Sequence, residues 1–301
     1  MNKEKVYYNS LNKYLYKLFG CKVYKISLNL GVTCPNRDGS LGTGGCIFCS
    51  KGGSGDFTPD SSLSIKEELE SAKALIKNKL PKNTPCKYIA YFQAFTNTYG
   101  DPEYLKKKYE EAMEDEDVVA LSIATRPDCL GPDILSVLKE INGKKKVFVE
   151  LGLQTIHEKS AEYIRRGYKL SVYDKAVEDL KSIGIEVVTH VILGLPGETK
   201  DDMLETVKYV SSKGPGGIKL QLLHILKNTD LATEYLEGRV KPLSFDEYRE
   251  ILIECVAALS DDIVVHRLTG DGKRSELLAP LWSLDKKRVL NGLSEYLSPR
   301  E

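Results

Sequence analysis

The feature that most constrains the fold is an alternation of β-branched segments with amphipathic helical segments between residues 22 and 226. We predict strands over residues 22–30, 87–95, 118–128, 145–155, 185–199 and 216–226, with helices between them. A strand–helix series of this kind folds as a parallel sheet with right-handed crossovers. These six units are too few to close an eight-stranded barrel. The sequence therefore predicts an α/β fold, a partial (β/α)6 TIM-like barrel.

The segments on either side of this alternation set the predicted domain limits. Residues 1–21 are expected to form an N-terminal helical extension, and residues 22–226 the barrel core. Residues 227–301 mix helical patterns with one short strand, so we expect a small α+β C-terminal extension on the substrate side. Ligands of such sheets bind at the carboxyl ends of the strands. Functional residues are therefore sought directly after each predicted strand.

Composition and charge indicate the cellular compartment and the partners to expect. Lys+Arg and Asp+Glu both number 43, so no overall positive charge attracts nucleic acid, although local basic clusters occur. No apolar run of about 18 residues exists, and the first residues lack the apolar core of a signal peptide. We expect a cytoplasmic protein without a membrane segment. In a reducing compartment, seven unevenly spaced cysteines favour a metal site over disulfide bonds.

Three of these cysteines lie in one glycine-rich loop after the first core strand. Cys34, Cys46 and Cys49 have the spacing C-x11-C-x2-C. The C-x2-C pair allows two thiolates to reach one metal centre, and the glycines permit close backbone approach to inorganic sulfides. Three thiolates fit an iron–sulfur cubane with one iron left open, whereas a structural zinc site normally has four ligands. The alternative is a zinc-stabilised binding module with Cys21 or a histidine as fourth ligand.

The cysteine loop resembles that of the radical S-adenosylmethionine (radical SAM) enzymes, in the branch that includes the catalytic subunit of Elongator. Later strand ends carry similar segments in the same order: "IATRPD" at residues 123–128, "ELGLQT" at 150–155, "RRGY" at 165–168 and "THVILGLPGET" at 189–199. The resemblance covers roughly residues 22–226. With the tail at residues 266–291, the pattern is most similar to the radical SAM family that includes the bacterial YhcC and YtqA proteins.

This resemblance implies a 4Fe–4S cluster and SAM as cofactors, with Cys34, Cys46 and Cys49 as the cluster ligands. In such enzymes the reduced cluster cleaves SAM to methionine and a 5′-deoxyadenosyl radical, which abstracts a hydrogen atom from the substrate. A flavodoxin- or ferredoxin-type protein is the expected electron donor.

The resemblance also implies contacts to SAM from residues at the ends of the core strands. The glutamine of the E-x-G-x-Q segment would reach the ribose, the arginine motif the methionyl carboxylate, and the Gly-Leu-Pro turn the adenine. Two motifs depart from the branch: residues 92–99 contain no Gly-Gly-Glu, and residue 124 is alanine where the branch has an acid. Thr96 and Arg126 are further candidates by position. The residues expected to bind SAM are Gln93, Asn97, Thr125, Gln154, Arg166, His190 and Gly194.

The substrate is predicted from the same resemblance. We expect modification of a tRNA wobble uridine, with local basic patches holding the tRNA. A small metabolite or tetrapyrrole is the alternative, suggested by the related coproporphyrinogen oxidases and by the balanced charge. Trp282, the only tryptophan, is either a base-stacking platform or a core aromatic residue. The candidate substrate contacts are Arg267, Asp271, Arg274 and Trp282.

Overall fold

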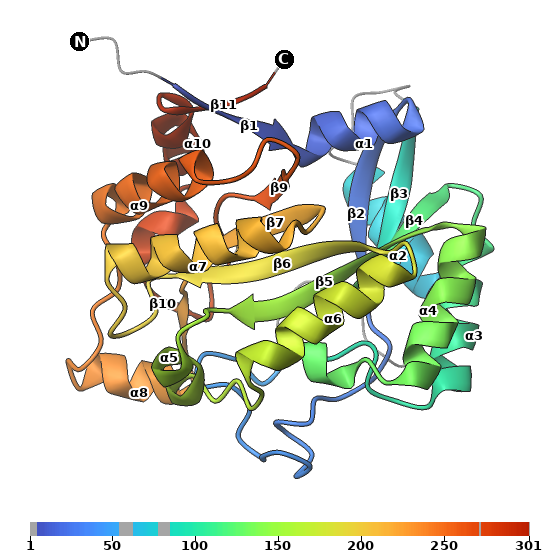
Figure 1. The fold of residues 1–301 in the computed structure, drawn as a ribbon, viewed down its shortest axis with the longest axis horizontal. Coiled ribbons are helices and arrows are strands. Elements are labelled where there is room, and N and C mark those ends of the chain that lie inside the picture. The colour runs from blue at the N-terminus through green and yellow to red at the C-terminus, as the bar shows by residue number, and fades with distance from the viewer. Residues whose placement is uncertain (1–4, 54–62, 78–84, 271, 301) are drawn as a thin grey trace.

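The computed structural model describes residues 5–53, 63–77, 85–270 and 272–300, which fold around one curved β-sheet (Figure 1). The predicted strand–helix alternation is confirmed. The strands are β1 (Val6–Ser10), β2 (Lys22–Leu28), β3 (Cys86–Phe92), β4 (Val118–Thr125), β5 (Lys146–Gln154), β6 (Glu186–Leu193), β7 (Gly217–Leu222), β8 (Ile225–Leu226), β9 (Val264–Arg267), β10 (Leu277–Ala279) and β11 (Leu297–Pro299).

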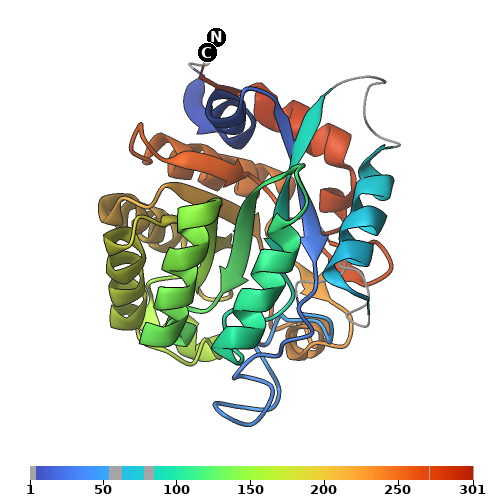
Figure 2. The same ribbon diagram turned by 90° about the vertical axis from the view of Figure 1, so that its right-hand side faces the viewer.

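Helices connect the core strands and cover the outer face of the sheet, as Figures 1 and 2 show. Within the described ranges, none of them combines the length and the apolar character needed to cross a membrane. The helices are α1 (Leu11–Phe19), α2 (Ile65–Lys77), α3 (Pro102–Met113), α4 (Pro132–Lys144), α5 (Glu158–Tyr163), α6 (Leu170–Ser182), α7 (Lys200–Lys213), α8 (Asp230–Leu236), α9 (Phe245–Ala257) and α10 (Lys286–Ser294), with 3-10 turns η1 (Pro127–Cys129) and η2 (Leu281–Leu284).

The main sheet is parallel throughout and contains nine strands of the described chain, in the order β11-β1-β9-β7-β6-β5-β4-β3-β2. Strands β2 to β7 are the six predicted strands, each paired with the next in sequence. They curl into the predicted partial barrel, and β9, β1 and β11 continue it beyond β7. The short strands β8 and β10 form a separate antiparallel pair.

The N-terminal segment differs from the expectation that residues 1–21 are helical. Helix α1 is present, but β1 precedes it and joins the sheet between β9 and β11. The segment "VYYNS" is rich in residues that favour strands, and the hydrogen-bond partners that fix it as a strand lie more than 250 residues away, at Val264 and Leu297. A prediction from local sequence does not include such partners.

Alternate residues of the core strands face the inside of the barrel. Nearest the amino ends of the strands these residues are apolar, and Leu15 of α1 packs onto them, so α1 closes this end of the interior. Two residues further along the same strands, the inward positions are mostly polar. The apolar layer is Val23, Ile89, Ala120, Phe148 and Val188. The polar layer above it is Lys25, Tyr91, Ser122, Glu150 and His190.

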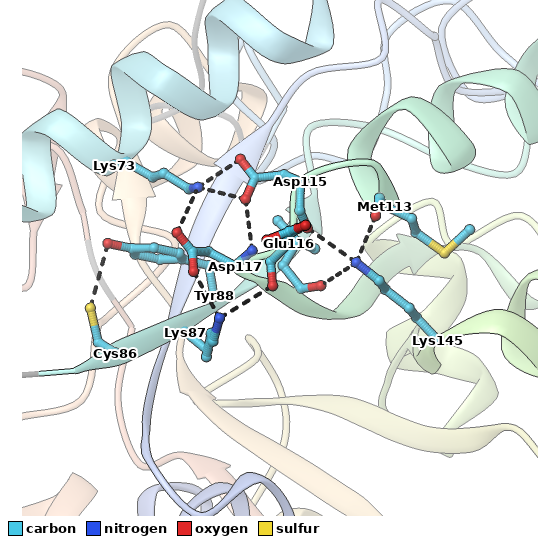
Figure 3. Close-up of polar contacts among 10 residues, drawn as sticks. Lys73, Cys86, Lys87, Tyr88, Met113, Asp115, Glu116, Asp117 and Lys145 are labelled. Carbon is cyan, nitrogen blue, oxygen red and sulfur yellow. Dashed lines mark hydrogen bonds and ion pairs between the residues drawn. The ribbon is translucent and has the colours of Figure 1, made fainter.

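A set of ion pairs fastens α2 to the amino ends of β3 and β4 (Figure 3). The ammonium group of Lys73 lies 2.6 Å from Asp115 and 3.6 Å from Asp117. Lys87 lies 2.8 Å from the other oxygen of Asp117. All four side chains are partly exposed. We call these four residues the outer network.

Lys145, at the end of α4, stabilises the adjoining turn (Figure 3). Its ammonium group donates hydrogen bonds to the carbonyl oxygens of Met113 at 2.6 Å, Asp115 at 3.1 Å and Val118 at 2.7 Å. It thereby satisfies carbonyl groups at the end of α3 and the start of β4.

Candidate functional site

A cavity of about 440 Å³ lies inside the barrel, lined by the cysteine loop, by every core strand or the residues after it, and by β9. Predicted site residues from seven different parts of the chain meet there, as expected when the strands of a parallel sheet end at one edge. Thr96 and Arg126 also line it. The predicted residues that the structure places on the cavity wall are Cys34, Cys46, Cys49, Gln93, Thr125, Gln154, Arg166, His190 and Arg267.

Two predicted residues shape loops beside the cavity and do not line it. The Asn97 amide donates to the carbonyl oxygens of Ala94 at 3.0 Å and Ala124 at 2.9 Å, which ties the β3 loop to β4. Gly194 has φ +94°, and a Cβ at this position would meet the Leu243 side chain at 3.0 Å. The amide at residue 97 and the glycine at residue 194 are therefore required by the local backbone structure.

The predicted substrate contacts of the tail do not gather in the cavity, apart from Arg267 on β9. Arg274 is exposed on a turn, and residue 271 lies outside the described residues. The Trp282 indole donates to the Leu243 carbonyl at 3.0 Å and packs against the rings of Phe245 and Tyr248, at 5.3 and 5.7 Å. Trp282 thus packs as a core aromatic residue.

The three loop cysteines are half-buried free thiols. The loop docks onto the segment after α5, because the Asn36 amide donates both to the Arg165 carbonyl at 2.7 Å and to the Cys46 sulfur at 3.5 Å. Figures 1 and 2 both show this loop projecting from the end of the barrel opposite the chain termini. The loop therefore lies at the carboxyl ends of the strands, and Cys34, Cys46 and Cys49 line the wall of the cavity.

Local charges favour the thiolate at one of these positions. A hydrogen bond donated by the Cys49 thiol, another from Asn36, and the charges of Arg126 and Arg37 lower the pKa of Cys46 to about 7, against the effect of burial. The same hydrogen bond and burial raise the pKa of Cys49 well above its usual value. Thiolates are the form that binds metal, and among this pair the thiolate is favoured at Cys46.

Gly45 allows a guanidinium group to pass under the loop. Its φ is +73°, and a Cβ there would lie 2.9 Å from Nε of Arg37. The Arg37 side chain donates to the carbonyl oxygens of Ser50 at 2.6 Å and Cys49 at 3.3 Å. Glycine at residue 45 is therefore required by the close approach as well as by the backbone conformation.

Strained backbone and unsatisfied polar atoms occur together on the cavity wall. Ala94, Phe95 and Gln154 have φ of +68°, +57° and +71°, values that non-glycine residues rarely adopt. At Gln154 the register of β5 against β6 shifts, which re-aims the side chain. The Gln154 Oε1 and Thr96 Oγ1 atoms are buried and have no hydrogen-bond partner among the described residues. Strain and buried unpaired atoms in one place indicate a ligand site.

Two of the predicted SAM contacts are already engaged by protein groups. Arg166 donates to the carbonyl oxygens of Tyr168 at 3.0 Å and Thr155 at 2.6 Å, and its guanidinium lies 4.8 Å from the centre of the Tyr168 ring. The Nε2 atom of His190 is 2.7 Å from Oε2 of Glu150. Arg166 therefore stabilises its own loop, and His190 points at a carboxylate within the barrel.

Sequence reasoning did not predict the polar cluster deep in the cavity, formed by Lys25, Glu150, His190 and Lys219, which we call the inner network. The Glu150 side chain is completely buried and accepts hydrogen bonds from Lys25 at 2.5 Å, from His190, and from Lys219. Ser122 donates to the same carboxylate at 2.6 Å. Charged residues within apolar strand segments such as "KVFVELGLQ" are the signal that could have found it.

Burial and mutual charge set the ionisation of the inner network. Burial, together with the charges of Lys25 and Arg267, lowers the pKa of Lys219 to about 7 despite the attraction of Glu150. Burial and the charge of Lys219 lower the pKa of His190 to about 4, so its imidazole is neutral. Burial opposes ionisation of Glu150, but the charges of Lys219 and Lys25 hold its pKa well below the usual range.

Comparison with known protein families identifies the group to which the chain belongs. Residues 28–210 match the model of the radical SAM superfamily, and residues 215–298 match that of the radical SAM C-terminal domain. The chain belongs to the radical SAM superfamily. The cofactors of this radical SAM enzyme are accordingly a 4Fe–4S cluster and SAM.

The relatives of this radical SAM chain agree with the predicted family. It is 42% identical to the uncharacterized protein YtqA of Bacillus subtilis over 293 residues, which cover 97% of this chain and 90% of YtqA. It is 34% identical to the protein YhcC of Escherichia coli K12 over 285 residues, with 94% and 90% coverage.

More distant radical SAM proteins match in fold or over part of the chain. The structure of Elp3 from Methanocaldococcus infernus superposes with a TM-score of 0.66 at 17% identity, covering 90% of this chain and 63% of that one. This likeness confirms the fold. The tRNA uridine(34) acetyltransferase of Methanocaldococcus jannaschii is 30% identical over 137 residues, or 44% of this chain and 25% of the acetyltransferase.

Proposed function

We propose that Cys34, Cys46 and Cys49 bind the 4Fe–4S cluster and that SAM binds beside it in the barrel cavity. When bound, the cluster supplies an electron that cleaves SAM to methionine and a 5′-deoxyadenosyl radical, which removes a hydrogen atom from the substrate. The observation that carries this proposal is the meeting of three thiols, strained loops and unsatisfied polar atoms on one cavity wall.

The number of thiols supports a cluster over a zinc ion. Cys34, Cys46 and Cys49 all line the cavity, whereas a structural zinc site normally has four protein ligands. Three cysteines suit a 4Fe–4S cluster in which one iron is left open for another ligand. Cys21, proposed above as a fourth zinc ligand, lies beyond the far end of β2, roughly 20 Å of strand away.

The polar groups on the wall support a place for SAM. The unpaired atoms of Gln154 and Thr96 are suited to the ribose hydroxyls and the amino group of SAM. Gln93 and Thr125 also line the cavity, where they are hydrogen-bonded to Ser27 at 2.8 Å and to Thr98 at 2.5 Å. Arg166 contributes positive charge near the carboxylate while it holds its loop. Asn97 and Gly194 act by shaping the loops around the cofactor, and His190 acts within the inner network.

For the substrate we propose a tRNA wobble uridine. The partial match to a tRNA uridine(34) acetyltransferase supports this proposal. The balanced charge of 43 basic and 43 acidic residues favours the second candidate, a small metabolite or tetrapyrrole. We also propose a flavodoxin- or ferredoxin-type electron donor and a cytoplasmic location.

Metal analysis of the anaerobically purified protein tests the cofactor proposal. The expected result is a brown protein that absorbs near about 400 nm and contains about three to four iron atoms per chain. The Cys46→Ala variant should contain at least tenfold less iron. A colourless protein with one zinc ion per chain would contradict the proposal.

Nucleoside profiles of tRNA test the substrate proposal. Cells that lack the gene should lose one modified wobble uridine and accumulate its precursor, and the wild-type gene should restore the profile. A gene encoding Cys86→Ala, a cysteine on β3 outside the loop, should also restore it. A profile that does not change when the gene is deleted would exclude tRNA and favour the small-molecule substrate.

A further inference from the structure

Two lysine side chains from distant strands converge on one carboxylate deep in the cavity. Lys25 is on β2, Lys219 is on β7, and four strands lie between them in the sheet. Both ammonium groups contact Glu150, which projects from β5. Both also lie over the face of the Tyr91 ring, 5.1 and 4.6 Å from its centre. The lysines thus face each other across the interior, on the side that the cavity reaches.

The charges in this region do not balance. Glu150 is the only acidic residue among the described residues that line the cavity. Its single negative charge faces the ammonium groups of Lys25 and Lys219, while Arg267 on the same wall adds positive potential. The histidines nearby contribute no negative charge, and the pKa of both His190 and His266 is held below the usual value, chiefly by burial.

A buried excess of positive charge is unfavourable. One lysine would suffice to neutralise Glu150, and His190 and Ser122 already donate hydrogen bonds to the carboxylate. An ammonium group in a protein interior is unfavourable without a counter-charge, and its pKa falls as a result, as it does at Lys219. The aromatic face of Tyr91 lessens this cost but adds no negative charge. A negatively charged ligand between the two lysines would supply this counter-charge and keep both side chains protonated.

We propose that the deep end of the cavity binds an anionic group of the substrate, a carboxylate or a phosphate, between Lys25 and Lys219. Glu150 acts as a positioning residue that holds the two ammonium groups in place. The inference rests on the proposed function, because it takes this cavity as the site of the radical reaction. Two residues further along the same strands, toward their carboxyl ends, the inward positions are Ser27, Gln93 and Gly152. This layer lies between the anion site and the cysteine loop. A substrate held by its anionic group between the two lysines would place its reacting carbon in this layer.

Binding should depend on pH through Lys219. The groups that face it are Glu150, Lys25, Tyr91, His190, His266 and Arg267. An ammonium group with a pKa of about 7 is charged below neutral pH and largely neutral at pH 8.5. A bound anion raises that pKa, so anion binding takes up a proton and weakens as the pH rises from 6.5 to 8.5.

Calorimetric titration with two simple anions tests the proposal. The cluster-reconstituted full chain, kept anaerobic and saturated with SAM, is titrated with inorganic phosphate and separately with acetate. The wild-type protein should bind at least one of them. Lys25→Met and Lys219→Met should each weaken that affinity at least tenfold, whereas Lys25→Arg should retain it. Lys73→Met, the same substitution in the outer network, should leave it unchanged.

The outcomes separate the possible sources of the anion. Binding of phosphate alone indicates a nucleotide phosphate, and binding of acetate alone indicates a carboxylate on the substrate. If neither anion binds, or if both Met variants bind as tightly as the wild type, the proposal is wrong. Should Lys219→Met fail to fold, Lys25→Met decides alone, because the Lys25 side chain is 18% exposed and its loss leaves Glu150 paired with Lys219. The titration does not measure SAM cleavage, so its failure leaves the proposed radical reaction standing.

Discussion

Two lysine–carboxylate networks on the core sheet differ in burial and in charge balance. In the outer network, Lys73 and Lys87 face Asp115 and Asp117, so the two positive and two negative charges cancel. The Asp117 side chain is 51% exposed. In the inner network, two lysines share Glu150, which is fully buried. The outer network is balanced and open to water, whereas the inner network is neither.

This difference shows how the same residue types serve stability in one place and function in another. Exposed ion pairs contribute little each, and their value in the outer network lies in fastening α2 to the sheet. A buried ion pair gives no stability advantage over apolar packing. We infer that the inner network serves binding, whereas the apolar layer below it, with Phe148 and Val188, supplies stability.

The largest expected effect is that of Glu150→Gln on stability. The substitution leaves the ammonium groups of Lys25 and Lys219 buried without a counter-charge. We expect a loss of about 3–5 kcal/mol in the free energy of unfolding, measured by urea denaturation of the cluster-free chain. A loss below about 1 kcal/mol would show that the inner network behaves like the outer one.

The next effect concerns pH. His190 has a pKa of about 4 in the folded protein and about 6.5 when unfolded, so below pH 6.5 only the unfolded chain takes up this proton. The stability contributed by the neutral imidazole is complete above pH 6.5 and falls toward pH 4, by about 2 kcal/mol at pH 5. His190→Gln keeps a donor to Glu150 but does not titrate there. Urea denaturation at pH 7 and pH 5 should show a smaller loss for this variant, and equal losses would refute the assignment.

A smaller effect is expected beside the outer network. Lys145→Met removes three hydrogen bonds to the carbonyl oxygens of Met113, Asp115 and Val118. Water can reach part of this turn, so we expect a loss of about 1–2 kcal/mol in the free energy of unfolding. No measurable change would mean that water replaces the ammonium group completely.

The smallest effect is expected for Asp117→Asn within the outer network. Half-exposed ion pairs contribute roughly 0–1 kcal/mol, and the contribution decreases with salt. Urea denaturation at low and high ionic strength should show a small difference from the wild type that disappears at about 1 M salt. A loss as large as that of Glu150→Gln would remove the distinction between the two networks.

The sequence predicted the elements whose signals are local. The six core strands follow from their apolar, β-branched segments. The cysteine loop is likewise contained in one short segment. These features depend on residues that are close together in the chain, so they can be predicted from the sequence.

Features that depend on distant pairings were not predictable. Strand β1 is fixed by β9 and β11 at the other end of the chain. Lys25 and Glu150 are 125 residues apart in sequence, and Lys219 and Glu150 are 69 apart. The sequence shows charges within strands, but only the folded barrel shows that they share one carboxylate. The core position of Trp282 was not predictable either, because its neighbours Phe245 and Tyr248 belong to α9, which is distant in sequence.

The most direct test of the cysteine assignment is formation of 5′-deoxyadenosine. The cluster-reconstituted protein is incubated anaerobically with SAM and dithionite, and the nucleoside is measured by chromatography. We expect 5′-deoxyadenosine from the wild type and from Cys86→Ala, and at least 100-fold less from Cys46→Ala. Equal amounts from Cys46→Ala and the wild type, or none from a wild-type protein that carries its full iron content, would contradict the account.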